Sequence, residues 1–216
     1  AHIVSHNLRS HAANLSGMVG YLEVESKDFV ENPFFQNFKS VIDNLMDSVV
    51  NLSEVADIQT NDLANLAKVN LVEIVKSSIL NVSALAKASD ITIQFESSLK
   101  KAWVMGDLMY LDSIVLNLLT NAIKYSDPKK EKTVLVTIED SAEWIILRVK
   151  DNGLGIDLKR QGRKIFGMYK TFHEHADSRG IGLFITKNQV EALGGKINVK
   201  SQEGVGSIFE VYLKNK

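Results

Sequence analysis

The sequence contains no cysteine, which excludes disulfide bonds, thiol chemistry and zinc sites built on cysteine. It has no long block of basic residues, and its formal net charge is −1, so a broad nucleic-acid-binding surface is not expected. No apolar run approaches the roughly 18 residues that a membrane span needs, and no signal peptide is visible. A composition of 45% hydrophobic and 24% charged residues indicates a globular protein.

Glycine and proline are scarce in the first half of the chain. Only Gly17 and Gly20 precede Gly106, and the two prolines, Pro33 and Pro128, stand where we expect structural elements to end. A length of 216 residues exceeds the commonest domain size of roughly 100–150 residues. We therefore expect two domains, a helical one over residues 1–64 and a mixed one over residues 65–216.

The first domain carries leucine-rich heptads that predict two amphipathic helices, one over about residues 1–26 and one after the turn Glu31-Asn32-Pro33. Such a helical hairpin cannot enclose its apolar face by itself. Pairing of two copies into a four-helix bundle is the simplest solution, and it predicts a homodimer. The heptad positions are Leu8, Leu15 and Leu22 in the first helix and Phe38, Leu45 and Leu52 in the second.

The second domain alternates between helical and strand periodicity, which predicts an α+β sandwich with helices on one face of a mixed sheet. Residues 60–65 form a plausible linker, and residues 153–179 form a long irregular segment. We expect helices over residues 71–87, 108–125 and 181–193, and strands over residues 91–95, 103–105, 134–138, 144–149, 196–200 and 208–213.

Asn117 and Asn121 lie one turn apart on the helix predicted over residues 108–125, so both amides share one face. Amide oxygens are hard ligands that suit Mg²⁺, which bridges phosphates in many proteins. Lys124, next on that face, would reach a phosphate oxygen. The alternative is that both asparagines are merely polar residues at the edge of a helix.

Two glycine-rich segments follow. In the turn Asp151-Asn152-Gly153-Leu154-Gly155, the aspartate can accept a hydrogen bond from an exocyclic amine such as that of adenine, although such a segment is often only a turn. Gly180 and Gly182 open a helix, whose N-terminus attracts phosphates, although glycines there also serve packing. Lys170 lies between the two segments, in either a basic lid over a triphosphate or a solvated loop.

His6 falls outside the leucine heptad positions and should be exposed on the first helix. An exposed helical histidine is usually only a surface residue. Beside a nucleotide site, however, a neutral imidazole is a nucleophile near neutral pH.

In this order the segments resemble the catalytic core of sensor histidine kinases of two-component systems, over essentially the whole chain. The resemblance implies a dimerisation hairpin followed by an ATP-binding domain of the GHKL (Bergerat) type. It implies that His6 is the phosphorylated residue and that Asn121, with Asn117, binds Mg²⁺. It also implies that Asp151 accepts a hydrogen bond from the adenine amine. Further nucleotide-binding residues would be Lys124, Tyr125, Gly153, Gly155, Phe166 and Lys170 in the lid, Gly180, Gly182 and the closing segment Gly204-Val205-Gly206-Ser207.

The resemblance also implies a function. ATP with Mg²⁺ would phosphorylate His6, and the phosphoryl group would pass to an aspartate on the receiver domain of a separate response regulator. The protein would be cytoplasmic, attached to a membrane only through an upstream sensor part that the sequence lacks.

Four positions depart from the family pattern. Asn7, beside the phosphoacceptor, stands where an acidic residue is common, and Ser10 where Thr or Asn often supports phosphatase activity. His11 replaces a proline, and Ser178 replaces a glycine. One rival is an ATPase of the gyrase, Hsp90 or mismatch-repair type, which the amide at Asn117 disfavours because it cannot act as a base. The other rival is a non-catalytic, nucleotide-sensing dimerisation module.

Overall fold

The computed structural model describes residues 2–25, 30–60, 66–162, 165–167 and 181–215, with only the backbone described for helical residues 2–9, 12, 44, 47, 48 and 50–60. The chain divides into two compact units, Ala1–Asp62 and Leu63–Lys216. Among the described helices, none combines the length and the apolar character needed to span a lipid bilayer.

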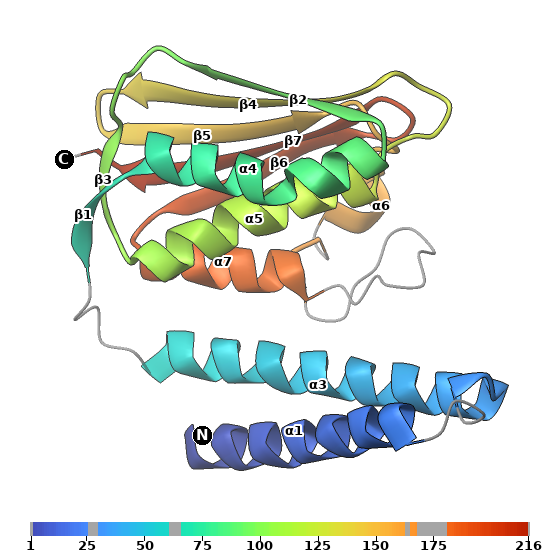
Figure 1. Cartoon of the computed structure of the whole chain (residues 1–216). Coiled ribbons are helices and arrows are strands. Elements are labelled where there is room, and N and C mark those ends of the chain that lie inside the picture. Colours follow the sequence, from blue (N-terminus) through green and yellow to red (C-terminus); the bar gives the residue numbers. More distant parts are fainter. Residues whose placement is uncertain (1, 26–29, 61–65, 163–164, 168–180, 216) are drawn as a thin grey trace. The chain divides into compact units, whose positions relative to one another are not determined.

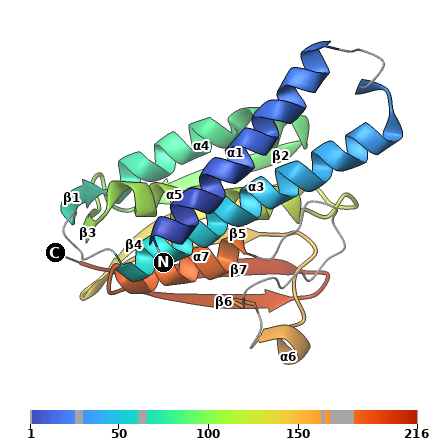
Figure 2. The ribbon, with the colours of Figure 1, turned by 90° about the horizontal axis from the view of Figure 1, so that it is seen from below.

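The first unit is a hairpin of α1 (His2–Glu25) and α3 (Pro33–Thr60), which lie side by side (Figure 2). This confirms the two predicted helices. Asn32 begins α3 by accepting a hydrogen bond from the Phe34 amide at 2.9 Å. A small apolar cluster of Val19, Phe35 and Ile42 is buried in the hairpin. The described heptad residues Leu15, Leu22, Phe38 and Leu45, in contrast, are 37–49% exposed.

The second unit is built on a five-stranded sheet with the order β2-β4-β5-β7-β6, in which β2 and β4 are parallel and the other neighbours antiparallel. The mixed sheet and the antiparallel pair of β4 and β5 were predicted. The strands are β2 (Ile91–Ser97), β4 (Lys132–Ser141), β5 (Trp144–Asp151), β6 (Lys196–Gln202) and β7 (Gly206–Lys214).

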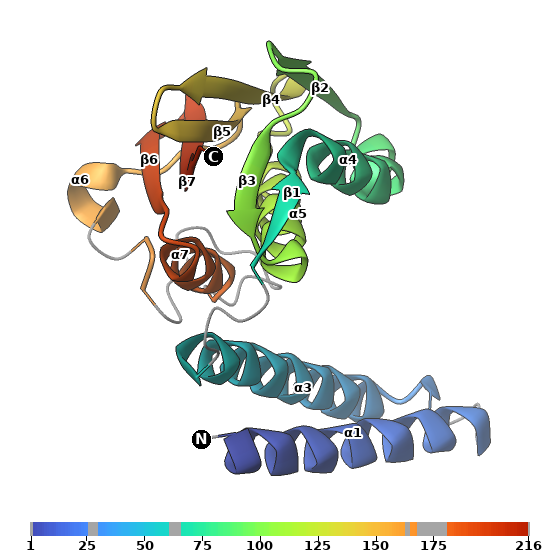
Figure 3. The same cartoon turned by 90° about the vertical axis from the view of Figure 1, so that its left-hand side faces the viewer.

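Three helices cover one face of this sheet, namely α4 (Leu71–Ala88), α5 (Leu108–Lys124) and α7 (Gly182–Ala192) (Figures 1 and 3). Helix α5 is the central one, and its Leu118 and Leu119 are almost completely buried. Asp107 caps its N-terminus by accepting hydrogen bonds from the amides of Met109 and Tyr110, at 2.8 and 3.2 Å.

The structure corrects the sequence-based expectations at two places. A strand was missed at β1 (Ala67–Asn70), which pairs with β3 (Trp103–Gly106) in a separate two-stranded sheet. Four residues are too few to show a period. The segment expected to be irregular contains the one-turn helix α6 (Leu158–Gln161), which is capped by Asp157.

Candidate nucleotide site

Helices α5 and α7 are joined by the amide of Asn117. Its Nδ2 donates to Thr186 Oγ1 at 2.6 Å, and its Oδ1 accepts a longer hydrogen bond from Asn121 Nδ2 at 3.4 Å. Gly182, the first residue of α7, lies so close to the Asn117 side chain that a Cβ atom there would collide with it. The two asparagines thus lie on one face, as expected, and a larger residue where α7 begins would displace the Asn117 amide.

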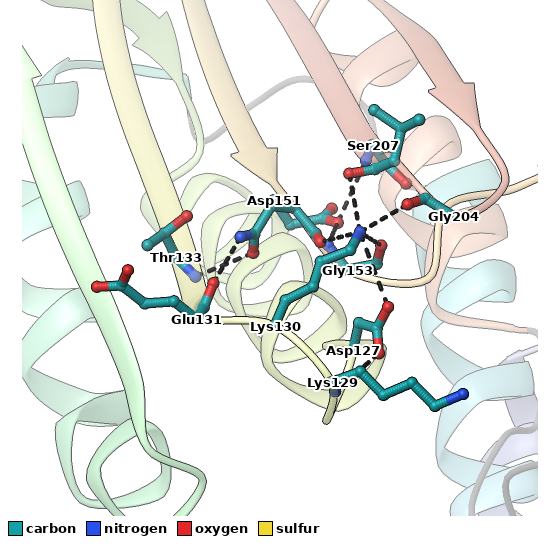
Figure 4. A network of polar contacts seen from close by, with 11 residues as sticks. Asp127, Lys129, Lys130, Glu131, Thr133, Asp151, Gly153, Gly204 and Ser207 are labelled. Atoms are coloured by element: carbon teal, nitrogen blue, oxygen red, sulfur yellow. Dashed lines mark hydrogen bonds and ion pairs between the residues drawn. The ribbon is translucent and has the colours of Figure 1, made fainter.

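Asp151, the last residue of β5, is a partly buried carboxylate whose Oδ1 accepts two backbone hydrogen bonds. The Gly153 amide donates at 2.9 Å and the Ser207 amide at 3.2 Å (Figure 4). Burial raises the pKa of the Asp151 carboxyl above its usual value of 3.8, against the opposing effects of these amides and of the Lys130 charge. Asp151 therefore presents an acceptor group in an environment with limited access to water.

Three backbone segments converge beside Asp151. The Leu154 amide donates to the carbonyl of Tyr125, at the end of α5, and the Leu154 carbonyl accepts from the Gly204 amide at 2.7 Å. Gly155 has a φ of +67° and lies against the Gln202 backbone, where a Cβ atom would overlap the carbonyl. The segment after β5 is therefore held between the end of α5 and the turn that joins β6 to β7.

Lys130 is the residue at this site that the sequence did not reveal. Its Nζ donates to the carbonyls of Asn152, at 3.0 Å, and Gly204, at 2.7 Å (Figure 4). It stands in the run Lys129-Lys130-Glu131-Lys132, and such a run of charged residues is typical of an ordinary solvated loop. The only available signal was its place between two expected site segments.

The structure describes some of the other expected site residues and leaves others outside its described part. Phe166 is partly buried and packs against the core of the second unit. Lys124 and Tyr125 are half-buried at the end of α5, with the Lys124 Nζ 5.9 Å from the centre of the Tyr125 ring. Lys170 and Gly180 lie outside the described residues. His6 and Asn7 lie on α1, and their side chains are outside the description.

The described site contains donor groups of several kinds. Among the residues that the structure describes, no group of three or more His, Asp or Glu side chains could hold a metal ion. The site instead combines one carboxylate, two amides and a helix N-terminus, which match an amine, a hard cation and phosphate oxygens respectively.

Comparison with protein families matches residues 106–216 to a known family. It is the family described as "Histidine kinase-, DNA gyrase B-, and HSP90-like ATPase". The matched region begins at Gly106, one residue before the cap of α5, and contains Asn117, Asn121 and Asp151.

Similar proteins include the methanogenesis regulatory histidine kinase FilI of Methanothrix harundinacea, 27% identical over 94% of this chain and 23% of that protein. The sensor histidine kinase ZraS of Salmonella typhi is 29% identical over 97% of this chain and 44% of that protein. The chain thus spans less than half the length of these relatives.

Among solved structures, full-length ShkA in complex with AMPPNP matches with a TM-score of 0.80 at 23% identity, over 99% of this chain and 45% of that one. The Acinetobacter baumannii histidine kinase AdeS matches with a TM-score of 0.68 at 18% identity, over 98% of both chains. At these identities the likeness concerns the fold.

Removing the Asp151 charge should stabilise the protein in the absence of ligands. Because burial raises the pKa of Asp151, the folded state favours the protonated carboxyl. The stability that this protonation provides is fully present below pH 3.8, and it is lost as the pH rises through the pKa of the folded state. Asp151→Asn keeps an oxygen for the two amides but has no charge to bury. We expect a higher unfolding temperature than wild type at about pH 7, with the difference shrinking towards about pH 3.

Asp157→Asn is the matched control, because Asp157 also accepts two backbone hydrogen bonds, from Lys159 and Arg160, at the N-terminus of α6. It should unfold like wild type at both pH values in a thermal scan. An Asp151→Asn variant that is less stable than wild type at neutral pH would contradict this account of the Asp151 environment.

Proposed function

Because the chain belongs to the histidine kinase-, DNA gyrase B- and HSP90-like ATPase family, we propose that it is the phosphotransfer core of a sensor histidine kinase. In this proposal the second unit binds ATP, and His6 on α1 receives the γ-phosphoryl group. The observation that carries the proposal is the Asp151 carboxylate, held by two turns in the same unit as the asparagines of α5. ShkA, solved in complex with AMPPNP, and the histidine kinase AdeS match the fold over 99% and 98% of this chain.

Asp151 is proposed to read the adenine base. Both backbone hydrogen bonds end on its Oδ1, so we assign Oδ2 to the exocyclic amine of adenine. Guanine carries a carbonyl oxygen at that position, which a carboxylate would repel. Partial burial strengthens this hydrogen bond, because water competes less for the carboxylate.

The phosphates are proposed to lie near the N-terminus of α7, and Mg²⁺ near Asn121, with Asn117 as a further amide. Asn121 donates through Nδ2 to Asn117 Oδ1, so the Oδ1 of Asn121 points the other way. Amide oxygens fit a hard cation. When bound, Mg²⁺ would neutralise negative charge on the phosphate oxygens. Gly182 keeps the first turn of α7 close to Asn117, and Lys124, Gly180 and Lys170 are the further phosphate-binding residues that we propose.

The chemical step forms a bond between one imidazole nitrogen of His6 and the γ-phosphorus. The bond from the γ-phosphorus to the β,γ-bridging oxygen breaks, and ADP leaves. The proton on the other ring nitrogen must then pass to an acceptor. Asn7 can orient the imidazole but stays neutral, so it cannot take up that proton, and we expect a slow kinase. Transfer onward to an aspartate of a response-regulator receiver domain completes the proposal.

Hydrolysis of ATP is disfavoured as the main reaction. An ATPase of this family would need a base near the metal-binding asparagine, one turn earlier on α5. That place is taken by Asn117, an amide already bonded to Thr186 and Asn121. Water therefore has no general base at this position.

The hairpin is proposed to form a four-helix bundle with a second copy. Its heptad residues are exposed in a single chain, with Leu22 37% and Phe38 49% accessible. Such a row of apolar side chains on a helical hairpin is usually covered. The same hairpin would carry the His6 phosphoacceptor.

Replacing His6 with Gln should abolish phosphate incorporation from ATP. The ATP affinity should stay unchanged, because the proposed nucleotide site lies in the second unit. Radiolabelling measures the first quantity and calorimetry the second. His11→Gln, an exposed histidine on the same helix, is the control that should still be labelled. Equal labelling of the His6→Gln variant and wild type would overturn the phosphoacceptor assignment.

Asp151→Asn should weaken ATP binding by about tenfold or more, since hydrogen bonds to charged groups contribute about 1.5–3 kcal/mol. The preference for ATP over GTP should fall with it. Calorimetric titration with both nucleotides tests this, with Asp157→Asn as the control that binds normally. Unchanged ATP affinity would remove Asp151 from the adenine site.

Leu22→Glu should convert a dimer into a monomer, because a carboxylate in the apolar interface would have to be desolvated. Val24→Glu is the control, since Val24 is 87% exposed and lies off the heptad positions. Sedimentation velocity compares the two variants. A wild-type chain that sediments as a monomer at high concentration would contradict the four-helix bundle.

A further inference from the structure

The ammonium group of Lys130 lies among four backbone carbonyl oxygens, which come from two turns (Figure 4). In the turn after β5 these are Asn152 O, at 3.0 Å, and Gly153 O, at 3.3 Å. In the turn between β6 and β7 they are Gly204 O, at 2.7 Å, and Val205 O, at 3.5 Å. Lys130 itself belongs to a third segment, between α5 and β4.

A short turn fixes the place of Lys130. Its backbone amide donates to the Asp127 carbonyl at 3.2 Å, and the Asp127 carboxylate lies 3.8 Å from its Nζ. The Lys129 amide also donates to that carboxylate, at 3.0 Å. In Figure 4 the Lys129 side chain extends away from the network that Lys130 enters. The two neighbouring lysines therefore differ sharply in surroundings.

The turns that Lys130 joins are the ones that surround Asp151. The Gly153 amide donates to Asp151, while the Gly153 carbonyl accepts from Lys130. Gly204 and Val205 come just before Ser207, whose amide is the other donor to Asp151. An ammonium group has three donor hydrogens and no acceptor, so it can bind several carbonyls at once, whereas these carbonyls could not bind one another.

We propose that Lys130 is a positioning residue of the nucleotide site, which fixes the two turns so that Asp151 faces the adenine amine. This assignment rests on the proposed function. Lys130 does not touch the base itself. It acts on the carboxylate through the turn that supplies the Gly153 amide, through the turn that precedes Ser207, and through its positive charge.

The charge of Lys130 has a separate effect from its hydrogen bonds. It opposes the burial that raises the pKa of Asp151, and so favours the ionised carboxylate that accepts the amine. Asp127 is paired with Lys130, and the β7 residue opposite Asp151 is the neutral Ser207. Loss of the Lys130 charge should therefore shift the acid limit of ATP binding to higher pH.

Three variants separate these effects, namely Lys130→Met, Lys130→Arg and the control Lys129→Met. Lys130→Met should weaken ATP binding by about tenfold and move the pH midpoint of binding upward. Lys130→Arg keeps the charge, but its planar guanidinium cannot reproduce the compact ammonium among four carbonyls. It should weaken binding while leaving the pH midpoint of wild type. Lys129→Met should match wild type in both.

Calorimetric titration of the full chain with ATP over a pH series supplies both readouts, and circular dichroism checks folding. A Lys130→Met variant that binds like Lys129→Met would overturn the assignment. If Lys130→Met does not fold, Lys130→Arg decides, because wild-type affinity in that variant would also overturn it. A wild-type chain that binds no ATP would instead refute the proposed function, and this assignment with it.

Discussion

The Asp151 carboxylate is stabilised by two backbone amides that are 54 residues apart in the chain, that of Gly153 in the turn after β5 and that of Ser207 at the start of β7. A partly buried charge needs such donors, because each lost hydrogen bond with water must be replaced. The requirement explains the close packing around it. Gly155 lies against the Gln202 backbone, and the Leu154 carbonyl accepts a hydrogen bond from the Gly204 amide. The Leu154 amide donates to the Tyr125 carbonyl at the end of α5.

The same interaction connects the fold to the proposed chemistry. Asp151 is the last residue of β5, the central strand of the sheet. The asparagines lie on α5, the central helix of the layer that covers the sheet. One end of the unit would therefore read the base with a carboxylate, while α5 and the start of α7 would hold the phosphates. The helices of the first unit carry His6 and an exposed apolar row. In the proposed function the second unit would supply the nucleotide, and the first unit would supply the nucleophile.

Much of this was predictable from periodicity. Helix α5 has a long apolar pattern and a capping aspartate, and β4 and β5 alternate clearly, so their existence followed from the sequence. The asparagine pair and Asp151 stood out because they combine with glycines at fixed spacing. Strand β1 could not be recognised in the sequence, since its pairing with β3 depends on residues more than 30 positions away.

Lys130 was invisible for a related reason. Its role depends on carbonyl oxygens, which every residue possesses, and on two turns brought together only by folding. A lysine beside three other charged residues gives no local sign of this. Thr186, which accepts from Asn117, is a similar case, because nothing in the sequence links α7 to that amide. Sequence reasoning named the groups that we propose to contact a nucleotide, and it missed Lys130 and Thr186, which bind the segments that carry those groups.

The central claim is that this chain moves a phosphoryl group from ATP to an imidazole nitrogen. Incubating the wild-type chain with Mg²⁺ and ATP labelled in the γ-phosphate, and then exposing the product to acid and to alkali, tests it most directly. Phosphohistidine predicts a protein-bound label that acid removes and alkali leaves in place. A label that survives acid, or release of labelled inorganic phosphate with no labelled protein at any stage, would contradict the account.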